Sequence, residues 1–285
     1  MIIAVANQKG GVGKSTTVVN LAAAFALKAA WARPENPDKI LVLDMDPQCN
    51  TVITLAGGVF SDSGIETPDV SLADFLGFRT AEPIMSVVKT SHLPVRGAGN
   101  LQFVFSTSAS MKAIRNELAG SGAADAGFRL VDVLEEIRAI YPYIFIDTGP
   151  AEDWLTTNAL AAATHVILPI EPAGFSIQGI EENFVYIEKI KKHMNPGLKV
   201  LGILPSRFHT TYTTQQDIVE FVDKRYADLI LPVVAERSSI YDAIQAGYDI
   251  FSFKPPRKIG DLISSDPATE EFAKVAAEVE HRLRS

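Results

Sequence analysis

Cysteine is almost missing from this chain of 285 residues, which contains Cys49 alone. A lone thiol excludes an internal disulfide and any single-chain cluster or zinc site built from several thiolates. Long hydrophobic runs are missing too, because Asn20 and Lys28 interrupt the best candidate before it approaches the ~18 residues that cross a membrane. Lys9 ends the N-terminal apolar run too early for a secretory signal. These absences favour a cytoplasmic protein.

Basic side chains are also in deficit. Lys and Arg total 26 against 34 Asp and Glu, and the formal net charge is −8. This balance argues against a protein coated in basic residues for nucleic acid, although a local patch remains compatible with it because screening confines the field to about 10 Å. Histidine is scattered over positions 92, 165, 193, 209 and 281, so no metal-ligating pair or Ser-His-Asp arrangement is indicated.

Apolar strand-like runs alternate with helix-like stretches, which is typical of a parallel sheet covered on both faces. We predict one domain over residues 1–285, an α/β fold with a mostly parallel central sheet flanked by helices on both faces. The predicted strands are Ile2–Ala6, Ile40–Leu43, Leu101–Phe105, Tyr143–Ile146, His165–Ile170, Lys199–Leu204 and Leu229–Val234. The predicted helices are Ser15–Trp31, Met111–Leu118, Arg129–Ile140, Ile177–Lys192, Thr214–Tyr226, Ile240–Ala246 and Pro267–Leu283. Residues 33–38 and 57–99 look like insertions, and we assign them no chemistry.

A glycine-rich stretch with the letters KGGVGKST joins the first predicted strand to the first predicted helix. Glycines let backbone N–H groups turn toward an anion, and the helix N-terminus adds a partial positive charge. Lys14 would reach the terminal phosphates of a nucleotide, and the Ser15 hydroxyl is placed to ligate Mg²⁺. The ordinary phosphate loop has glycine where this chain has Gln8, and a second lysine, Lys9, stands at the front. The predicted nucleotide-binding residues are Gly10, Gly11, Val12, Gly13, Lys14, Ser15 and Thr16.

This stretch, K-G-G-x-G-K-[ST], resembles the deviant P-loop of the ParA/MinD group of ATPases, and residues 6–16 resemble ParA closely. The resemblance extends, with gaps, over nearly the whole chain. It implies a SIMIBI-type P-loop NTPase fold that uses ATP and Mg²⁺. It also implies that Lys9 reaches across a nucleotide-sandwich homodimer to the ATP of the partner. We therefore expect Lys9, Lys14 and Asp46 to act in catalysis.

Two carboxylates, Asp44 and Asp46, follow the second predicted strand. Ligands of open α/β sheets bind at the carboxyl ends of the strands, where these side chains lie. The letters DMDPQ resemble switch I of ParA proteins, which implies that Asp46 positions the attacking water and that Asp44 supports the Mg²⁺ shell. The alternative is that either residue caps the next helix. Cys49 stands where the family usually has glycine, and we interpret it as a small packed residue rather than a redox site.

Asp147 ends another apolar strand, Tyr143–Ile146. A carboxylate at that position suits Mg²⁺, usually through a bound water, beside the P-loop hydroxyl. The family pattern after this aspartate is commonly Thr or Cys followed by two prolines, so Gly149 departs from it and is expected to loosen switch II. The ParA-like pattern returns at residues 153–160 and 168–179.

The ParA resemblance implies that the ATP-bound dimer binds DNA without sequence preference and that a ParB-like centromere-binding or adaptor protein stimulates slow hydrolysis. Basic residues are concentrated in the stretches 186–209 and 251–260. An ordinary solvated helix face is the alternative for each of them. Because the chain starts directly at its first strand, we do not expect operator-specific repression. The predicted DNA contacts are Lys189, Lys192, Arg207, Arg237, Lys254 and Arg257.

Our first choice is therefore a partition or cargo-positioning ATPase associated with the nucleoid. The second is a MinD-like switch that acts on a membrane or a protein. A MinD-like switch needs a basic amphipathic C-terminal helix, whereas the polar face of 267–283 is largely acidic. We expect that helix to pack on the domain through Phe272, Val275, Val279 and Leu283, and we expect no membrane partner. An iron–sulfur carrier or a tyrosine kinase is the third choice, disfavoured by the single cysteine and by the lack of tyrosines after Tyr248.

Overall fold

The computed structural model describes residues 1–58, 68–93, 99–172, 176–209, 213–253 and 266–285. Within these residues a seven-stranded sheet has the order β3-β4-β2-β5-β1-β6-β7. Neighbouring strands run parallel, except that β3 and β4 are antiparallel. The strands are β1 (Ile2–Val5), β2 (Ile40–Asp44), β3 (Val88–Thr90), β4 (Leu101–Val104), β5 (Tyr143–Asp147), β6 (His165–Ile170) and β7 (Lys199–Pro205).

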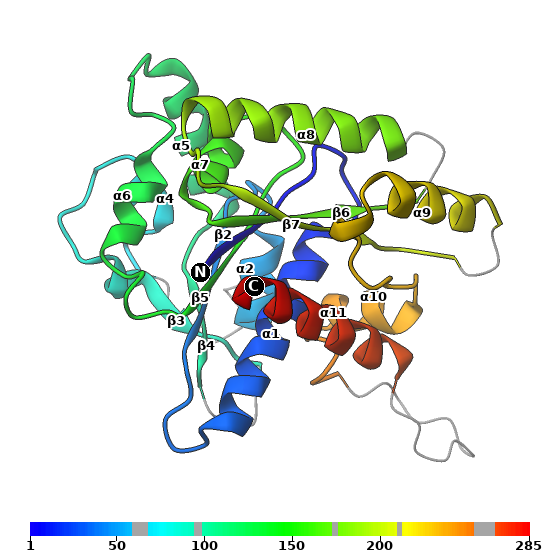
Figure 1. Ribbon diagram of the computed structural model, residues 1–285. Coiled ribbons are helices and arrows are strands. Elements are labelled where there is room, and N and C mark those ends of the chain that lie inside the picture. The colour runs from blue at the N-terminus through cyan, green and yellow to red at the C-terminus, as the bar shows by residue number, and fades with distance from the viewer. Residues whose placement is uncertain (59–67, 94–98, 173–175, 210–212, 254–265) are drawn as a thin grey trace.

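Helices cover both faces of the sheet (Figure 1). One face packs against α1 (Lys14–Ala32), α2 (Asn50–Ala56), α10 (Ser238–Gln245) and α11 (Pro267–Arg284). The other face packs against α4 (Leu72–Leu76), α5 (Ser108–Gly120), α6 (Arg129–Glu135), α7 (Trp154–Ala162), α8 (Ser176–His193) and α9 (Thr213–Arg225). The 3₁₀ turns η1 (Ile84–Val87) and η2 (Ala227–Leu229) complete the elements.

Each central strand contributes side chains to two hydrophobic cores. In β1, Ile3 and Val5 belong to the core on the α1 side, whereas Ile2 and Ala4 belong to the core on the α8 side. This alternation follows from the two-residue period of a strand. Because both faces are covered, β1 is apolar at every position, as expected for a buried parallel strand. The fold therefore confirms the predicted covered sheet, and it brings the carboxyl ends of β1, β2 and β5 to one edge.

The predicted strand Leu229–Val234 is wrong. Leu229 ends the turn η2, and Ile230 forms only an isolated bridge with Ile203 of β7. Pro232 has no N–H to donate, so a ladder could not continue through it. The seventh strand is instead β3, a three-residue antiparallel edge strand within the region that the sequence analysis treated as an insertion.

Four helices also differ from prediction. The predicted helix Arg129–Ile140 ends as an α-helix at Glu135, and α2, α4 and α7 were not predicted as helices. The predicted packing of the C-terminal helix is confirmed, because its apolar stripe is buried in the core beside α1. Among the described residues, every helix is too short or too polar to cross a membrane.

Candidate functional site

The glycine-rich loop connects the carboxyl end of β1 to the N-terminus of α1. Gly11 and Gly13 have φ angles of 75° and 87°, in the left-handed region that favours glycine. Gly13 is the N-cap of α1 and offers no capping side chain. The first amides of α1 therefore have no side-chain partner from the cap, and they form a ready anion-binding site.

The two lysines of the loop have different environments. Lys14 is buried, and its Nζ donates to the carbonyl oxygen of Lys9 at 3.1 Å. Burial lowers the pKa of Lys14, and the negative charges of Asp147 and Asp46 oppose that shift. Lys9 is more exposed, with its Nζ 3.4 Å from a carboxylate oxygen of Glu171. Lys14 is thus held inside the loop, whereas Lys9 is tethered by one exposed contact.

Asp147 is completely buried at the end of β5. Its Oδ2 accepts a 2.7 Å hydrogen bond from the hydroxyl of Thr51, and the hydroxyl of Ser15 is close enough to lower the pKa of the carboxyl. Its Oδ1 has no partner among the described residues. Burial raises the pKa of Asp147 to about 6, although the two hydroxyls oppose the rise. An unpaired buried carboxylate oxygen beside a hydroxyl fits a hard cation such as Mg²⁺. Thr51 is not among the site residues predicted from the sequence.

Such a cation would need ligands besides protein carboxylates. The described residues contain no group of three or more His, Cys, Asp or Glu side chains that could hold a metal ion. Mg²⁺ typically keeps several waters and binds through one or two carboxylates together with substrate phosphates. The pair formed by Ser15 and Asp147 matches that ligand set.

Asp44 lies opposite Asp147 in the register of β2 and β5. Its Oδ1 accepts from the backbone N–H of Asp46 at 2.9 Å, and its Oδ2 accepts from those of Thr51 and Val52 at 2.9 and 3.3 Å. Burial, and then the neighbouring charge of Asp147, raise the pKa of Asp44 well above its ordinary value. Oδ2 thus caps the start of α2 and Oδ1 holds the turn after β2, so the contacts are those of the helix-capping alternative rather than of a metal ligand.

Asp46 is half-buried and lines the cleft over the P-loop. Its Oδ1 accepts from the backbone N–H of Gln48 at 2.9 Å. Gly149 packs beside it: a Cβ at that glycine would lie 3.6 Å from the Asp46 Cγ, which is an ordinary contact. Glycine at position 149 therefore leaves space next to Asp46, although a larger side chain would not clash with Asp46 there.

Cys49 precedes α2 with a φ of 54°, in the left-handed region that favours glycine. The side chain is buried, and its Sγ lies 3.5 Å from the hydroxyl of Ser106. Burial, together with the negative charge of Asp44, raises the pKa of the thiol to about 12. The structure thus supports a packed, inert cysteine.

We expect native Cys49 to be almost unreactive toward a soluble aryl disulfide at pH 8. A thiol with a pKa of about 12 is thiolate in only about one molecule in 10⁴ at that pH, whereas a free cysteine is ionised in roughly a quarter of molecules. Stopped-flow absorbance should therefore show labelling about 10³-fold slower in the folded protein than in guanidinium-unfolded protein. Equal rates in the two states would contradict the packed geometry.

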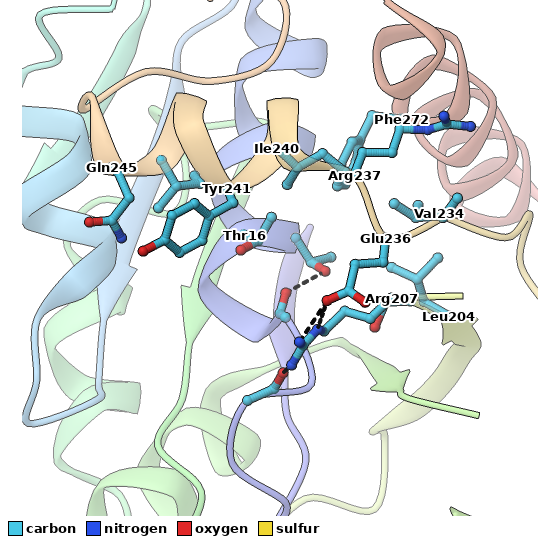
Figure 2. A pocket seen from close by; sticks show the side chains of 16 residues that line it. Thr16, Leu204, Arg207, Val234, Glu236, Arg237, Ile240, Tyr241, Gln245 and Phe272 are labelled. Atoms are coloured by element: carbon cyan, nitrogen blue, oxygen red, sulfur yellow. Dashed lines mark hydrogen bonds and ion pairs between the residues drawn. The ribbon is translucent and has the colours of Figure 1, made fainter. Parts of the chain in front are cut away.

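Two adjoining pockets flank the P-loop. One encloses about 490 Å³ and lies over the glycine-rich loop. It is lined by Gly10, Gly11, Gly13, Lys14, Ser15, Thr16, Asp46, Asn50, Ile53, Thr54, Pro150, Ile244 and Gln245. The second encloses about 380 Å³ and is mainly apolar (Figure 2): its lining includes Leu204, Val234, Ile240, Tyr241, Ile244 and Phe272. The pockets share part of the loop and the end of α10, so they form one cleft. The sequence analysis did not locate the second pocket.

Arg207 joins the P-loop to the wall of the second pocket. Its Nη1 donates to the carbonyl oxygen of Gly11 at 3.0 Å, and its Nη2 donates to Glu236 at 2.7 Å (Figure 2). Arg237 is paired with Glu271 of α11. Both arginines therefore lie around the cleft with acidic partners.

The predicted DNA contacts do not form one surface among the described residues. Lys189 and Lys192 are exposed on α8, on the other face of the sheet from α10 and α11. Arg207 and Arg237 line the cleft instead. The predicted contacts Lys254 and Arg257 lie outside the described residues. The described part of the chain thus supports at most a small basic area on α8.

Comparisons with known proteins agree with this geometry. Residues 1–200 match a family model described as "AAA domain". The chromosome partitioning protein ParA of Myxococcus xanthus is 31% identical over 237 residues, covering 83% of this chain and 75% of that protein. An McdA variant of Cyanothece in complex with ATP superposes with a TM-score of 0.77 at 17% identity, over 99% of this chain and 96% of that one. A cobyrinic acid a,c-diamide synthase of Mycobacterium smegmatis, with an ATP analogue and magnesium bound, gives 0.72 at 22% identity over 100% and 96%.

Proposed function

Because the chain belongs to the ParA family of P-loop ATPases, we propose that it is a partition or positioning ATPase whose substrate is ATP with Mg²⁺. The observation that carries this proposal is the buried carboxylate of Asp147, which has an unpaired oxygen beside the P-loop hydroxyl of Ser15. Leaving a buried carboxylate oxygen unpaired is costly, so a bound cation gives a physical reason for its presence.

The loop and the start of α1 bind the phosphates in this proposal. Backbone amides around Gly11 and Gly13 donate to the phosphate oxygens, and the ammonium group of Lys14 neutralises charge on the terminal phosphate. Ser15 and Asp147 would hold the Mg²⁺, which would supply positive charge to offset the charge that develops on the transferred group. The adjoining apolar pocket takes the nucleoside, because its size and lining suit an aromatic base.

Hydrolysis to ADP and phosphate needs a positioned water. Within the described part of the chain, Asp46 is the carboxylate that lines the pocket over the glycine-rich loop. We assign it the role of orienting that water. Lys9 is more exposed and can leave Glu171 at little cost, because exposed ion pairs contribute about 0–1 kcal/mol. It is therefore free to reach the nucleotide of a second copy and to make hydrolysis depend on dimerisation.

The ATP-bound dimer would then bind DNA without sequence preference, and a ParB-like partner would stimulate hydrolysis. Family membership and the exposed Lys189 and Lys192 of α8 support the DNA step. Dimerisation doubles the number of such lysines that face one duplex, and phosphate binding of this kind depends steeply on salt.

The test is size-exclusion chromatography with light scattering, followed by DNA retention, with ATP·Mg²⁺ and with ADP·Mg²⁺. We expect a dimer that is retained on DNA at low salt with ATP, and a monomer that is not retained with ADP. A dimer that ignores DNA would exclude the DNA step but keep the sandwich ATPase. A monomer in both nucleotides would exclude the role proposed for Lys9.

A MinD-like switch is the second candidate function. Such a switch requires an exposed amphipathic helix, whereas the apolar stripe of α11 is buried in the core. Sedimentation with anionic liposomes and ATP distinguishes the two functions, and we expect the protein to stay in the supernatant.

A further inference from the structure

A buried pair of amide side chains lies behind the front of the P-loop. Asn7 follows β1, and Asn183 lies on α8, on the other side of the sheet from α1. Both are buried, with 7% and 4% of their surface exposed. The Nδ2 of Asn183 donates to the Oδ1 of Asn7 at 3.1 Å and to the carbonyl oxygen of Gly179 at 2.6 Å. A helix of the far layer is thus hydrogen-bonded to the segment that leads into the loop.

The same pair holds the backbone at the front of the loop. The Oδ1 of Asn183 accepts from the N–H of Gln8 at 3.2 Å, and the Oδ1 of Asn7 accepts from the N–H of Lys9 at 2.8 Å. The Nδ2 of Asn7 donates to the carbonyl oxygen of Pro169 in β6 at 2.7 Å. Two consecutive backbone N–H groups are therefore fixed by side chains rather than by the sheet.

The back of the loop is fixed independently. The backbone N–H of Thr17 donates to the carbonyl oxygen of Gly13 at 2.8 Å within the first turn of α1, and the Ser206 hydroxyl donates to the carbonyl oxygen of Val12 at 2.6 Å. None of these contacts involves Asn183. A change at Asn183 therefore acts on the front of the loop and leaves the residues that cradle the phosphates in place.

Because the front and the back of the loop are held by separate contacts, we propose that Asn183 is a positioning residue for Lys9. It fixes the backbone from which Lys9 reaches the nucleotide of a second copy, and it does not contribute to nucleotide binding by a single chain. The inference rests on the proposed function. Within the described part of the chain, the Lys9 side chain is oriented by the exposed contact with Glu171 alone, so its direction depends on the backbone. Pre-organisation of that backbone reduces the ordering cost of dimerisation.

Asn183→Asp removes both donated hydrogen bonds and keeps the size of the side chain. Asn195→Asp is a matched control, because the Nδ2 of Asn195 likewise donates to two carbonyl oxygens, those of Leu160 and Ala163 at 3.0 and 2.7 Å, away from the P-loop. Each of these substitutions is combined with Asp46→Ala in the same chain, so that hydrolysis does not deplete the ATP-bound state. Asn183→Ala accompanies them, since it removes the two donated bonds and also the bond accepted from the N–H of Gln8, without burying a charge.

Two measurements distinguish a specific effect on dimerisation from a general loss of the loop structure. Calorimetry gives the affinity for ADP·Mg²⁺, and sedimentation velocity gives the dimer dissociation constant with ATP·Mg²⁺. We expect both Asn183 variants to weaken the dimer at least about 10-fold, with ADP affinity changed less than about 3-fold. Asn195→Asp should change neither constant, whatever its melting temperature.

An unchanged dimer constant in either folded Asn183 variant overturns the inference while leaving the proposed function standing. Loss of ADP affinity in step with the dimer also overturns it, because the residue would then support the whole loop. If the protein with native Asn183 remains monomeric with ATP, the proposed function fails, and the inference fails with it. A variant that does not fold is recognised by circular dichroism, and the other Asn183 variant then decides.

Discussion

Asp46→Ala is expected to lower ATP hydrolysis by at least about 100-fold while an ATP-bound dimer accumulates on DNA, since removing a group that positions a reacting water typically costs 10²–10⁴ in rate. The Asp46 side chain lines the phosphate half of the cleft and accepts from the N–H of Gln48, whereas the hydroxyl of Thr51 is bonded to Asp147. Its loss therefore leaves the phosphate cradle and the Ser15–Asp147 pair in place. Phosphate release measures the rate, and light scattering with DNA retention measures the trapped dimer.

Lys14→Ala provides the contrast. It removes the buried cation that spans the loop, so we expect neither nucleotide binding nor dimerisation, and the variant should remain monomeric with ATP. If Asp46→Ala hydrolyses ATP at the native rate, the water-positioning role belongs to another residue. If it behaves like Lys14→Ala, then Asp46 contributes to binding rather than to the chemical step.

Asp147→Asn is expected to have opposite effects on activity and stability. Without the carboxylate, the Mg²⁺-dependent hydrolysis should fall at least about 100-fold. The nucleotide-free protein should nevertheless become more stable at pH 8, because burial raises the pKa of Asp147 to about 6 in the fold. With one pKa unit corresponding to about 1.4 kcal/mol, the free energy of unfolding should rise by about 3 kcal/mol.

The sign follows from which form the fold prefers. A raised carboxyl pKa means that the fold favours protonated Asp147 over ionised Asp147. The stability that the protonated group gives the native protein is fully present below the unfolded pKa of about 4, and it is lost as the pH rises through about 6. The advantage of Asp147→Asn should therefore be absent at pH 4 and reach its maximum above pH 6. Urea titrations at several pH values, without nucleotide and with a chelator, measure it.

Asp249→Asn is the matched control for this prediction. Asp249 is also buried, with its Oδ2 unpartnered among the described residues, and burial raises its pKa. It does not line either pocket of the cleft. We expect a gain in stability of the same sign with hydrolysis unchanged. A loss of hydrolysis in both variants would mean that the Asp147 effect is structural rather than a loss of the cation site.

The phosphate half of the cleft was predictable from the sequence because its parts are local. The loop from Lys9 to Thr16 carries its own geometry in its glycines, and the positions of Asp46 and Asp147 follow from where apolar strands end. Parallel strands meet at one edge, so sequence position was enough to bring these side chains together.

The rest depends on contacts that sequence spacing does not reveal. Leu229–Val234 has a strand-like composition, but after the isolated bridge at Ile230 the ladder ends, whereas the three residues of β3 are too few to give a pattern. The apolar pocket draws its lining from segments more than 200 residues apart. Arg207 looked like part of a basic surface because its acidic partner, Glu236, is distant in the sequence.

The place of β1 in the sheet has a consequence for how the chain is made. This strand precedes the other strands in the sequence, yet its two neighbours are β5 and β6, which end at Asp147 and Ile170. A nascent chain shorter than that exposes β1 with both edges unpaired and the glycine loop attached to no finished sheet. Such non-local pairing is slow and leaves partly synthesised chains open to aggregation. The residues from β1 through β6 must therefore be made before the centre of the sheet can close, and the glycine-rich loop becomes ordered late although it precedes β5 and β6 in the sequence.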